Sequence, residues 1–266
     1  MPVSNTDLTA TMQQYTWHTQ PLASMDTVHL LLWHGVLGAV AYSAGGEPLC
    51  AHFYDIDSCD AKGIKEIVLN EPLLADTQQV AKVWIASERN LLVPNELFEP
   101  EAAASWLATF QYVAVGEKVL QHPLTVIGAH AVFVAGQAYA SLLATYFDKA
   151  AVQTFAPVIL GNMPAKGFAA NLYRLHGHTY VTIKNDGQLL CHRLLLHAAL
   201  DDVYYLTMRV AAVHDIPQAS VNLGCGGFGW TDDLRADVLA AFPQASIAYD
   251  NEAALLSSLK ELWLCA

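Results

Sequence analysis

The chain is predicted to fold into two similar α/β lobes, because two stretches of its sequence follow one pattern. Residues 30–53 contain an apolar run, a His-Gly turn, a β-rich run, a glycine-containing turn and a third run with a cysteine. Residues 172–194 repeat this order, with the two His-Gly turns 142 residues apart and the two cysteines 141 apart. We therefore expect two β-β-β-α-β-α units with mixed sheets and a cleft between them.

The elements after the three strands also occur twice. Each copy continues with a helix, a short strand and a second helix, expected at 61–75, 80–86 and 94–110 in the first copy and at 201–215, 220–224 and 231–242 in the second. Residues 130–135 and 137–147 predict a further strand and helix that finish the first lobe. Asp186-Gly187 supplies the positive φ that a tight hairpin turn requires, so a turn is expected there.

These elements divide the chain into four predicted parts. They are an N-terminal extension (1–26), a first lobe (27–150), a connecting segment (151–166) and a second lobe (167–266). Pro157 and Pro164 favour a break in the regular elements of the connecting segment, although Pro157 also suits the first turn of a short helix.

Composition excludes several classes of protein. The chain has 266 residues, of which 54% are apolar and 14% charged, which is typical of a globular protein with a large core. Its net charge of −12 argues against nucleic-acid binding, because neutralising phosphates needs clustered Lys and Arg. No apolar run approaches the ~20 residues of a membrane helix. Five scattered cysteines and a start without signal-peptide features favour a cytoplasmic protein with reduced thiols.

Two tandem lobes of this kind resemble the actin-like ATPase (ribonuclease H-like) fold, in which nucleotide lies in the interlobe cleft. Residues 92–98 (LVPNELF) resemble a segment of an uncharacterised bacterial family, domain of unknown function 3822. Residues 200–206 (LDDVYYL), followed by a helix and by a strand that closes on Gly224, resemble that family's second-lobe segment. The resemblance covers the chain from about Val28 onward. It implies an actin-like fold and no established activity.

Active members of the actin-like class carry an Asp at the first hairpin of each lobe, which organises Mg²⁺ and its waters. The matching turns here are His34-Gly35 and His176-Gly177, so both carboxylates are replaced by histidine, a poor Mg²⁺ ligand. The turn glycines remain and could hold an anion. They also have a simpler explanation, since Gly is the usual turn residue. We take His34, Gly35, Gly177 and Thr179 as candidate nucleotide contacts, with ATP as the possible ligand and no metal.

The glycine-rich segment 223–229 (LGCGGFG) supplies three more candidates, Gly224, Gly226 and Gly227. In the actin-like interpretation this turn contacts adenosine. Taken alone, it also fits G-x-G-x-x-G between a strand and a helix, with Asp250 following Gly229 by 21 residues. That spacing is typical of dinucleotide or S-adenosylmethionine domains. Such a fingerprint opens its sheet, however, and only 37 residues follow Gly229, so a permuted fold would be required.

Other clusters are explained more simply by packing. The pairs His176/His178 and His192/His197 lack zinc-site spacing, and no CxxC is present. Cys50 and Cys191 are expected to pack as small apolar residues, since the sequence shows no polarising partner for a nucleophile.

Three functions remain open. The first is a non-catalytic, degenerate nucleotide-cleft scaffold that binds a protein partner, with no contact to nucleic acid or membrane. The second is an active ATP-dependent enzyme of the actin-like class that uses an acidic residue such as Asp55 or Asp186. The third is a nucleoside-cofactor enzyme, using S-adenosylmethionine or a dinucleotide, with a permuted fold. The missing carboxylates favour the first.

Overall fold

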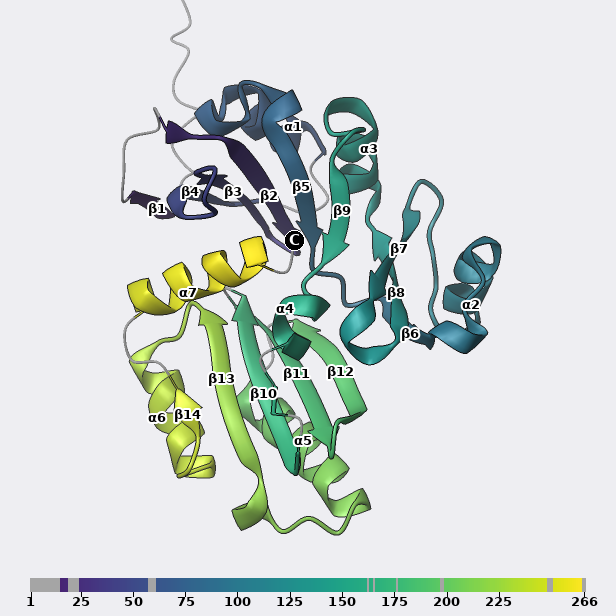
Figure 1. The fold of residues 1–266 in the computed structure, drawn as a ribbon, viewed down its shortest axis with the longest axis vertical. Coiled ribbons are helices and arrows are strands. Elements are labelled where there is room, and N and C mark those ends of the chain that lie inside the picture. The colour runs from purple at the N-terminus through teal and green to yellow at the C-terminus, as the bar shows by residue number, and fades with distance from the viewer. Residues whose placement is uncertain are drawn as a thin grey trace, which may run out of the picture. The chain divides into compact units, whose positions relative to one another are not determined.

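The computed structural model describes residues 15–18, 24–56, 61–161, 163–164, 166–175, 177–196, 199–247 and 251–264 (Figure 1). The α-helices are α1 (Ala61–Asn70), α2 (Ala103–Phe110), α3 (Gln137–Tyr146), α4 (Ala156–Gly161), α5 (Leu200–Val213), α6 (Asp232–Ala241) and α7 (Asn251–Leu264). The first nine strands are β1 (Tyr15–His18), β2 (Thr27–Trp33), β3 (Val36–Tyr42), β4 (Pro48–Asp55), β5 (Val80–Ile85), β6 (Asn90–Pro94), β7 (Lys118–Leu124), β8 (Ala129–Ala135) and β9 (Ala151–Thr154). The others are β10 (Phe168–Leu175), β11 (His178–Asn185), β12 (Gln188–Leu196), β13 (Asn222–Phe228) and β14 (Ser246–Ile247).

The chain forms two compact units, each built from three segments. The first unit contains residues 1–87, 100–122 and 132–154, and the second contains residues 88–99, 123–131 and 155–266. A three-stranded sheet is ordered β6-β8-β7. The predicted interlobe cleft stays a prediction, and the two units are described separately below.

The first unit is built on a six-stranded sheet in the order β1-β4-β3-β2-β5-β9. Strands β2, β3 and β4 are antiparallel neighbours, whereas β5 runs parallel to β2 and β9 runs parallel to β5. Every residue of β2 and β3 is buried, which is why these strands read as continuous apolar runs instead of alternating ones. Helices α1 and α3 contact each other.

The second unit has a five-stranded sheet in the order β12-β11-β10-β13-β14. Its β10, β11 and β12 are antiparallel, and β13 and β14 continue the sheet in parallel. Alternate residues of these strands form a core with Val203 and Ala211 of α5 and Val238 of α6. The helices α5 and α6 therefore cover one face of this sheet.

The predicted duplication is confirmed within the two sheets. The order β4-β3-β2-β5-β9 of the first unit matches β12-β11-β10-β13-β14 of the second, strand by strand and in direction. Residues 30–53 and 172–194 each form the expected three-stranded antiparallel unit.

One predicted equivalence is wrong. The second helix of the first lobe was expected at 94–110, but that range holds two 3₁₀ turns, η4 (Asn95–Leu97) and η5 (Pro100–Ala102), and an α-helix, α2, only at Ala103–Phe110. The α2 helix leads to β7 of the three-stranded sheet. In chain order the counterpart of α6 is α3, because each of these helices precedes the last parallel strand of its sheet. The first unit has an insertion between β5 and α3 that contains α2. Because of it, α2 is the next α-helix after β5 in the chain, and this made α2 resemble the counterpart of α6.

Two local predictions can also be followed. Asp186 and Gly187 have φ angles of +47° and +80° and join β11 to β12, which confirms the tight hairpin turn. Residues 151–166, expected to connect the lobes, contain β9 and α4. Within the described part of the chain, no helix combines the length and apolar character needed to span a membrane.

Candidate functional site

The first predicted hairpin turn forms as expected. His34 and Gly35 connect the paired residues Trp33 and Val36, and Gly35 has a φ of +78° that favours glycine. His34 is exposed, and the Gly35 carbonyl accepts a 2.9 Å hydrogen bond from the amide of Ile56. The turn thus presents an imidazole where an acidic residue would be needed to organise Mg²⁺.

One carboxylate does reach this turn from another strand. Asp55 ends β4 and is the cross-strand partner of Val36, directly after the turn. The other acidic residue considered, Asp186, lies at the opposite end of β11 from Gly177, roughly 30 Å away over nine residues of extended chain. Its Oδ1 accepts a 2.9 Å hydrogen bond from the Gly167 amide, which is a turn-stabilising role.

The second hairpin contains a contact that the sequence did not suggest. Gly177 has a φ of +90°, and the neighbouring Thr179 is buried. Nη1 of Arg174 lies 3.4 Å from Oγ1 of Thr179, and its Nε donates a 2.7 Å hydrogen bond to the Gly229 carbonyl. The hydroxyl of Thr179 therefore contacts the guanidinium of Arg174, which also binds a backbone carbonyl. His176 lies outside the described residues.

The three candidate glycines of the glycine-rich segment, Gly224, Gly226 and Gly227, line a pocket of about 280 Å³ in the second unit. Its walls are Asn171 and Tyr173 of β10, residues 224–227 of β13, and the α7 face that carries Ser257, Ser258 and Glu261. None of the described lining residues is a lysine or an arginine. Ligand sites span about 300–1,000 Å³, so this pocket is small, and its one charged group is a carboxylate.

Sheet packing accounts for the glycine at position 227. Gly227 pairs with Arg174 of β10 and has a φ of +79°, and a Cβ there would overlap the Arg174 carbonyl oxygen. A Cβ on Gly226 would lie 3.2 Å from the Tyr173 ring, whereas one on Gly224 would meet nothing closer than 3.9 Å. Gly227 is thus required by the close approach of two strands.

The glycines also lie in the wrong place for a dinucleotide fingerprint. Such a fingerprint needs its glycines in the turn after the strand, where the helix N-terminus meets the phosphates. Here residues 224–227 are inside β13, which extends to Phe228. The predicted strand ended at Gly224, which is why the segment resembled a loop.

The structure does not gather all the predicted residues into one site. Asn171 and Tyr173 line the pocket, so the intervening side chains of β10 point to the other face of the sheet, as the core residue Leu172 does. Arg174 shares that face with its cross-strand partner Thr179. Thr179 is therefore separated by the sheet from the pocket of Gly224, Gly226 and Gly227.

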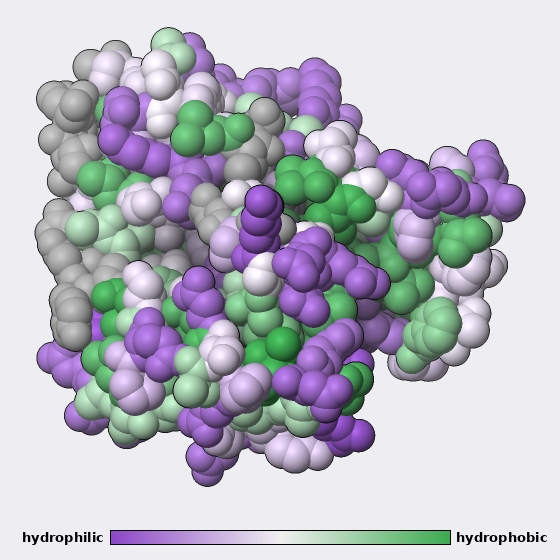
Figure 2. Space-filling model, turned by 60° about the horizontal axis from the view of Figure 1, so that its bottom comes forward, coloured by the Kyte–Doolittle hydropathy of each residue, from purple (hydrophilic) through white to green (hydrophobic). Residues whose placement is uncertain are grey.

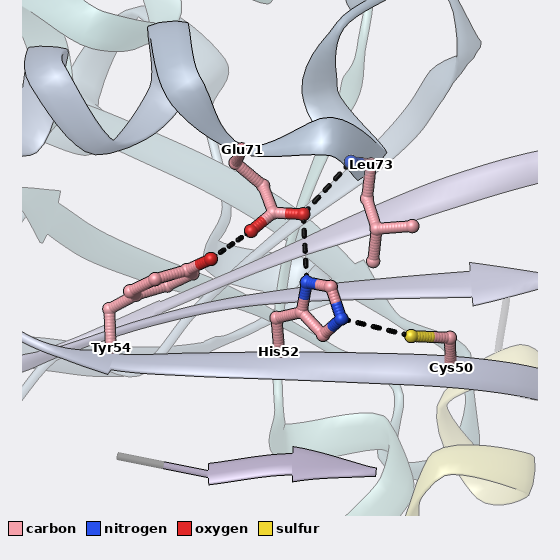
Figure 3. Close-up of polar contacts among 5 residues, drawn as sticks. All are labelled: Cys50, His52, Tyr54, Glu71 and Leu73. Atoms are coloured by element: carbon pink, nitrogen blue, oxygen red, sulfur yellow. Dashed lines mark hydrogen bonds and ion pairs between the residues drawn. The ribbon is translucent and has the colours of Figure 1, made fainter. Parts of the chain in front are cut away.

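A connected polar cluster of the first unit lies elsewhere, on β4 (Figure 3). Cys50, His52 and Tyr54 alternate along this strand and point to one face of the sheet. Nε2 of His52 lies 3.2 Å from the Cys50 sulfur, and Nδ1 donates a 2.9 Å hydrogen bond to Oε1 of Glu71. The hydroxyl of Tyr54 donates to the other carboxylate oxygen.

Glu71 is held by its position at the start of a short helical turn, η2 (Pro72–Leu74). It is the N-cap residue of this turn, and its Oε1 accepts a 2.8 Å hydrogen bond from the Leu73 amide. The side chain is fully buried, so three donors together replace the water that this carboxylate loses. The cluster therefore fastens η2 to the face of β4.

The contacts within the cluster shift the ionisation of its members. Hydrogen bonds to Cys50 and then to Glu71 raise the pKa of His52 to about 9, against the opposing effect of burial. Burial raises the pKa of Glu71, but the hydrogen bonds from His52, Tyr54 and Leu73 outweigh it and lower the pKa overall. At neutral pH the cluster therefore holds an imidazolium and a carboxylate.

A Cys-His-acid series is also the arrangement of an activated thiol nucleophile. The sulfur of Cys50 is fully buried, however, and a nucleophile must be reached by its substrate. The second unit has Cys191, Arg193 and Leu195 at the matching positions and lacks this series. Cys50 is buried as expected, but it does have a polar partner that the sequence analysis did not identify, His52, two residues along β4. Glu71, which completes the series, lies 19 residues from His52 and is brought to it only by the fold.

Among the described cysteines, Cys50, Cys191 and Cys225 are not in disulfides, and Cys59, Cys265 and His197 lie outside the described residues. Among the residues that the structure describes, no three His, Cys, Asp or Glu side chains are placed to share a metal ion. His192 is half-buried, stacks on the Tyr180 ring and has its Nδ1 2.8 Å from Oγ1 of Thr182, as expected of a packed histidine.

The chain has an actin-like ATPase fold, as comparison with solved structures shows. A Bacteroides thetaiotaomicron protein with actin-like ATPase fold and unknown function has a TM-score of 0.75 and 16% sequence identity, with 92% of this chain and 98% of that chain covered. A structure of the PilM–PilN type IV pilus biogenesis complex has a TM-score of 0.50 and 14% identity, with 91% and 98% covered.

The family is established by sequence. A family profile described as "Protein of unknown function (DUF3822)" matches residues 42–227, so the chain belongs to this family, as its motifs predicted. No curated protein matches the chain. Family and fold are therefore defined, whereas the activity has to be inferred from the chain's own residues.

The first prediction concerns the glycine-rich segment. Gly227→Ala should lower the free energy of unfolding by more than ~2 kcal/mol, because a side chain there combines a strained φ with a backbone overlap. Gly224→Ala is the matched control and should cost no more than about 1 kcal/mol, since its Cβ would make only ordinary contacts, the nearest at 3.9 Å. Urea denaturation measures both. Equal effects would contradict a structural requirement specific to Gly227.

The second prediction concerns pH. The ordinary pKa of histidine is 6.5 and that of His52 in the fold is about 9, so its stabilising contribution is complete below pH 6.5 and is lost as the pH rises to 9. His52→Gln should remove a stability difference between these pH values on the order of 1–2 kcal/mol, allowing for solvent screening of the half-buried ring. Denaturant titrations at pH 6.5 and 9 measure it.

The control is His192→Gln. Burial lowers the pKa of His192 to about 4, so its ionisation affects stability only below pH 6.5. The change in stability between pH 6.5 and 9 should therefore be the same in this variant as in the natural chain. A His52 variant that also keeps that change would show that His52 does not carry it.

Proposed function

We propose that this protein is a non-catalytic actin-like scaffold that binds a protein partner and does not hydrolyse ATP. The observation that carries the proposal is the chemistry of the two hairpin turns. Each has a His-Gly pair at the place where an actin-like ATPase has an acidic residue. Without that carboxylate a turn has no ligand for Mg²⁺ or for the waters around it.

The surroundings of the candidate nucleotide residues support the same conclusion. The pocket at Gly224, Gly226 and Gly227 carries a carboxylate and none of its described lining residues is a cation, so it offers nothing to neutralise a triphosphate. Thr179 is engaged by Arg174 on the other face of the sheet. The overall charge of −12 further opposes binding of a highly charged anion.

The role of partner binding rests on a comparison. The PilM–PilN structure, which shares this fold at a TM-score of 0.50, is a complex of two different proteins and is described as part of type IV pilus biogenesis. A sequence identity of 14% supports a shared fold but does not identify the partner of this chain. The comparison nevertheless supports a scaffold in which binding a protein, rather than turning over a nucleotide, is the function.

An active ATP-dependent enzyme is the second candidate, and one observation favours it. Asp55 lies across the strand pair from Val36, at the first turn, and could replace the missing carboxylate from β4. In this alternative Asp55 would bind the metal-bound waters, and His34 and Gly35 would contact phosphate.

The third prediction separates these candidates by hydrolysis. Purified protein with ATP and Mg²⁺ should release phosphate no faster than the buffer, since neither turn carries a metal-organising carboxylate. Turnover that disappears in Asp55→Asn but survives in Asp186→Asn would contradict the proposal and establish the second candidate. Asp186 is a suitable control because it sits at the far end of its strand.

The fourth prediction concerns binding. A ligand at 100 times its Kd stabilises a protein by ~2.7 kcal/mol, which for a chain of this length corresponds to a rise of roughly 5–10 °C in melting temperature. We expect ATP–Mg²⁺ and S-adenosylmethionine at millimolar concentration each to shift the melting temperature by less than ~2 °C. Thermal denaturation with each ligand measures this.

Two outcomes would change the interpretation. A clear shift with ATP that is lost in Gly226→Val, which would crowd the Tyr173 ring, would mean that the glycine-rich pocket binds nucleotide. A shift with S-adenosylmethionine alone would favour the nucleoside-cofactor enzyme.

A further inference from the structure

The first unit has an open strand edge beside a groove. Strand β7 is at the end of the sheet ordered β6-β8-β7, so within the described residues it has a neighbouring strand on one side only. Residues Val119, Leu120 and Gln121 of β7 line a groove of about 310 Å³. Successive residues of a strand point to opposite faces, so three in a row can line one groove only if it follows the strand edge.

The far wall of this groove is built from small residues. It consists of Pro100, Glu101, Ala103 and Ala104, which precede and begin α2. The methyl side chains of the two alanines leave space between the helix and the strand. An open edge presents backbone N–H and C=O groups, and these are satisfied best by another strand.

The surface at the end of α2 and just after it is apolar in a way that suits a binding face. Phe110, Tyr112 and Val115 are 65%, 78% and 96% exposed. Figure 2 shows hydrophobic residues beside hydrophilic ones on the part of the surface at its right, which carries α2 and β7. Exposed apolar groups of this size that lie close together in the chain are typical of interaction sites.

We propose that an extended, basic segment of another protein binds in this groove as an additional strand along the edge of β7. This inference rests on the proposed function, because it assigns the site at which the scaffold takes its partner. Backbone hydrogen bonds to β7 would supply affinity, and alternate side chains of the ligand would face the alanine wall. Short or β-branched apolar residues fit that wall.

The charge of the region selects a basic ligand. Residues 95–122 contain four glutamates and one lysine, and Glu101 is exposed in the groove wall. A lysine or arginine of the ligand would pair with Glu101. A second copy of this chain is a poor occupant, because each copy carries a charge of −12 and repels the other.

The test uses the full chain and a phage-displayed library of random seven-residue peptides. The library is selected on the natural protein after depletion on Ala104→Trp, which fills the groove at an exposed helix position. We expect enriched peptides that alternate apolar residues with Lys or Arg. Synthetic copies should bind at least about tenfold more weakly to Ala104→Trp, and N-methylation of alternate amides should abolish binding.

Matched variants on α6 control for surface changes in general. Ala236→Trp and Asp237→Lys alter exposed positions of that helix and should leave peptide affinity within about twofold. Glu101→Lys should weaken binding roughly threefold to fivefold, the size expected for one exposed charge pair. Thermal denaturation establishes that each variant is folded.

Several results would overturn the inference. The first is a selection that yields no peptides with a preference for the natural chain over Ala104→Trp. The second is a set of selected peptides that bind the Ala104→Trp and Ala236→Trp variants equally well. The third is a dimer of the natural chain in solution that Ala104→Trp dissociates. Such results would leave the scaffold proposal intact, whereas ATP turnover would refute that proposal without bearing on the groove.

Discussion

The parallel pairing of one strand with the first strand of a hairpin is the constraint on which each unit depends. β5 lies along β2, and β13 lies along β10, so each hairpin strand is buried between two neighbours. In the second unit this approach leaves no space for a side chain at Gly227. One glycine of a pattern that resembles a nucleotide fingerprint, Gly227, is thus explained by backbone packing, and the pattern itself lies inside a strand instead of in the turn that a cofactor site requires.

The parts of the fold that sequence could predict are those fixed by local chemistry. Apolar runs marked β2 and β3, positive-φ residues marked the turn at Asp186, and a spacing of 142 residues marked the duplication. The cluster of His52 and Glu71, the contact of Arg174 with Thr179 and the groove beside β7 were missed. Each of these joins residues through tertiary structure, and a single sequence contains no record of such proximity.

The two units have diverged in chemistry while keeping one strand order. The first unit places an imidazolium and a carboxylate between its sheet and η2, whereas the second has Arg193 and Leu195 at the matching strand positions. The side chains around each His-Gly turn differ as well, with Asp55 beside one and Arg174 near the other. The strand order is the same in both units because it buries the central strands, whereas the polar side chains at matching positions differ.

The segment composition of the units has a consequence for how the protein can be made and dissected. The chain passes from one unit to the other five times, at residues 87, 99, 122, 131 and 154. On the ribosome, the first sheet therefore stays without its outer strand β9 until both early segments of the second unit have already been synthesised. A gene cut at the end of the first unit would deliver a second half that lacks residues 88–99 and 123–131. The segments of the two units thus alternate along the chain. To exchange a whole unit between two relatives, three separate segments of the gene would have to be replaced instead of one.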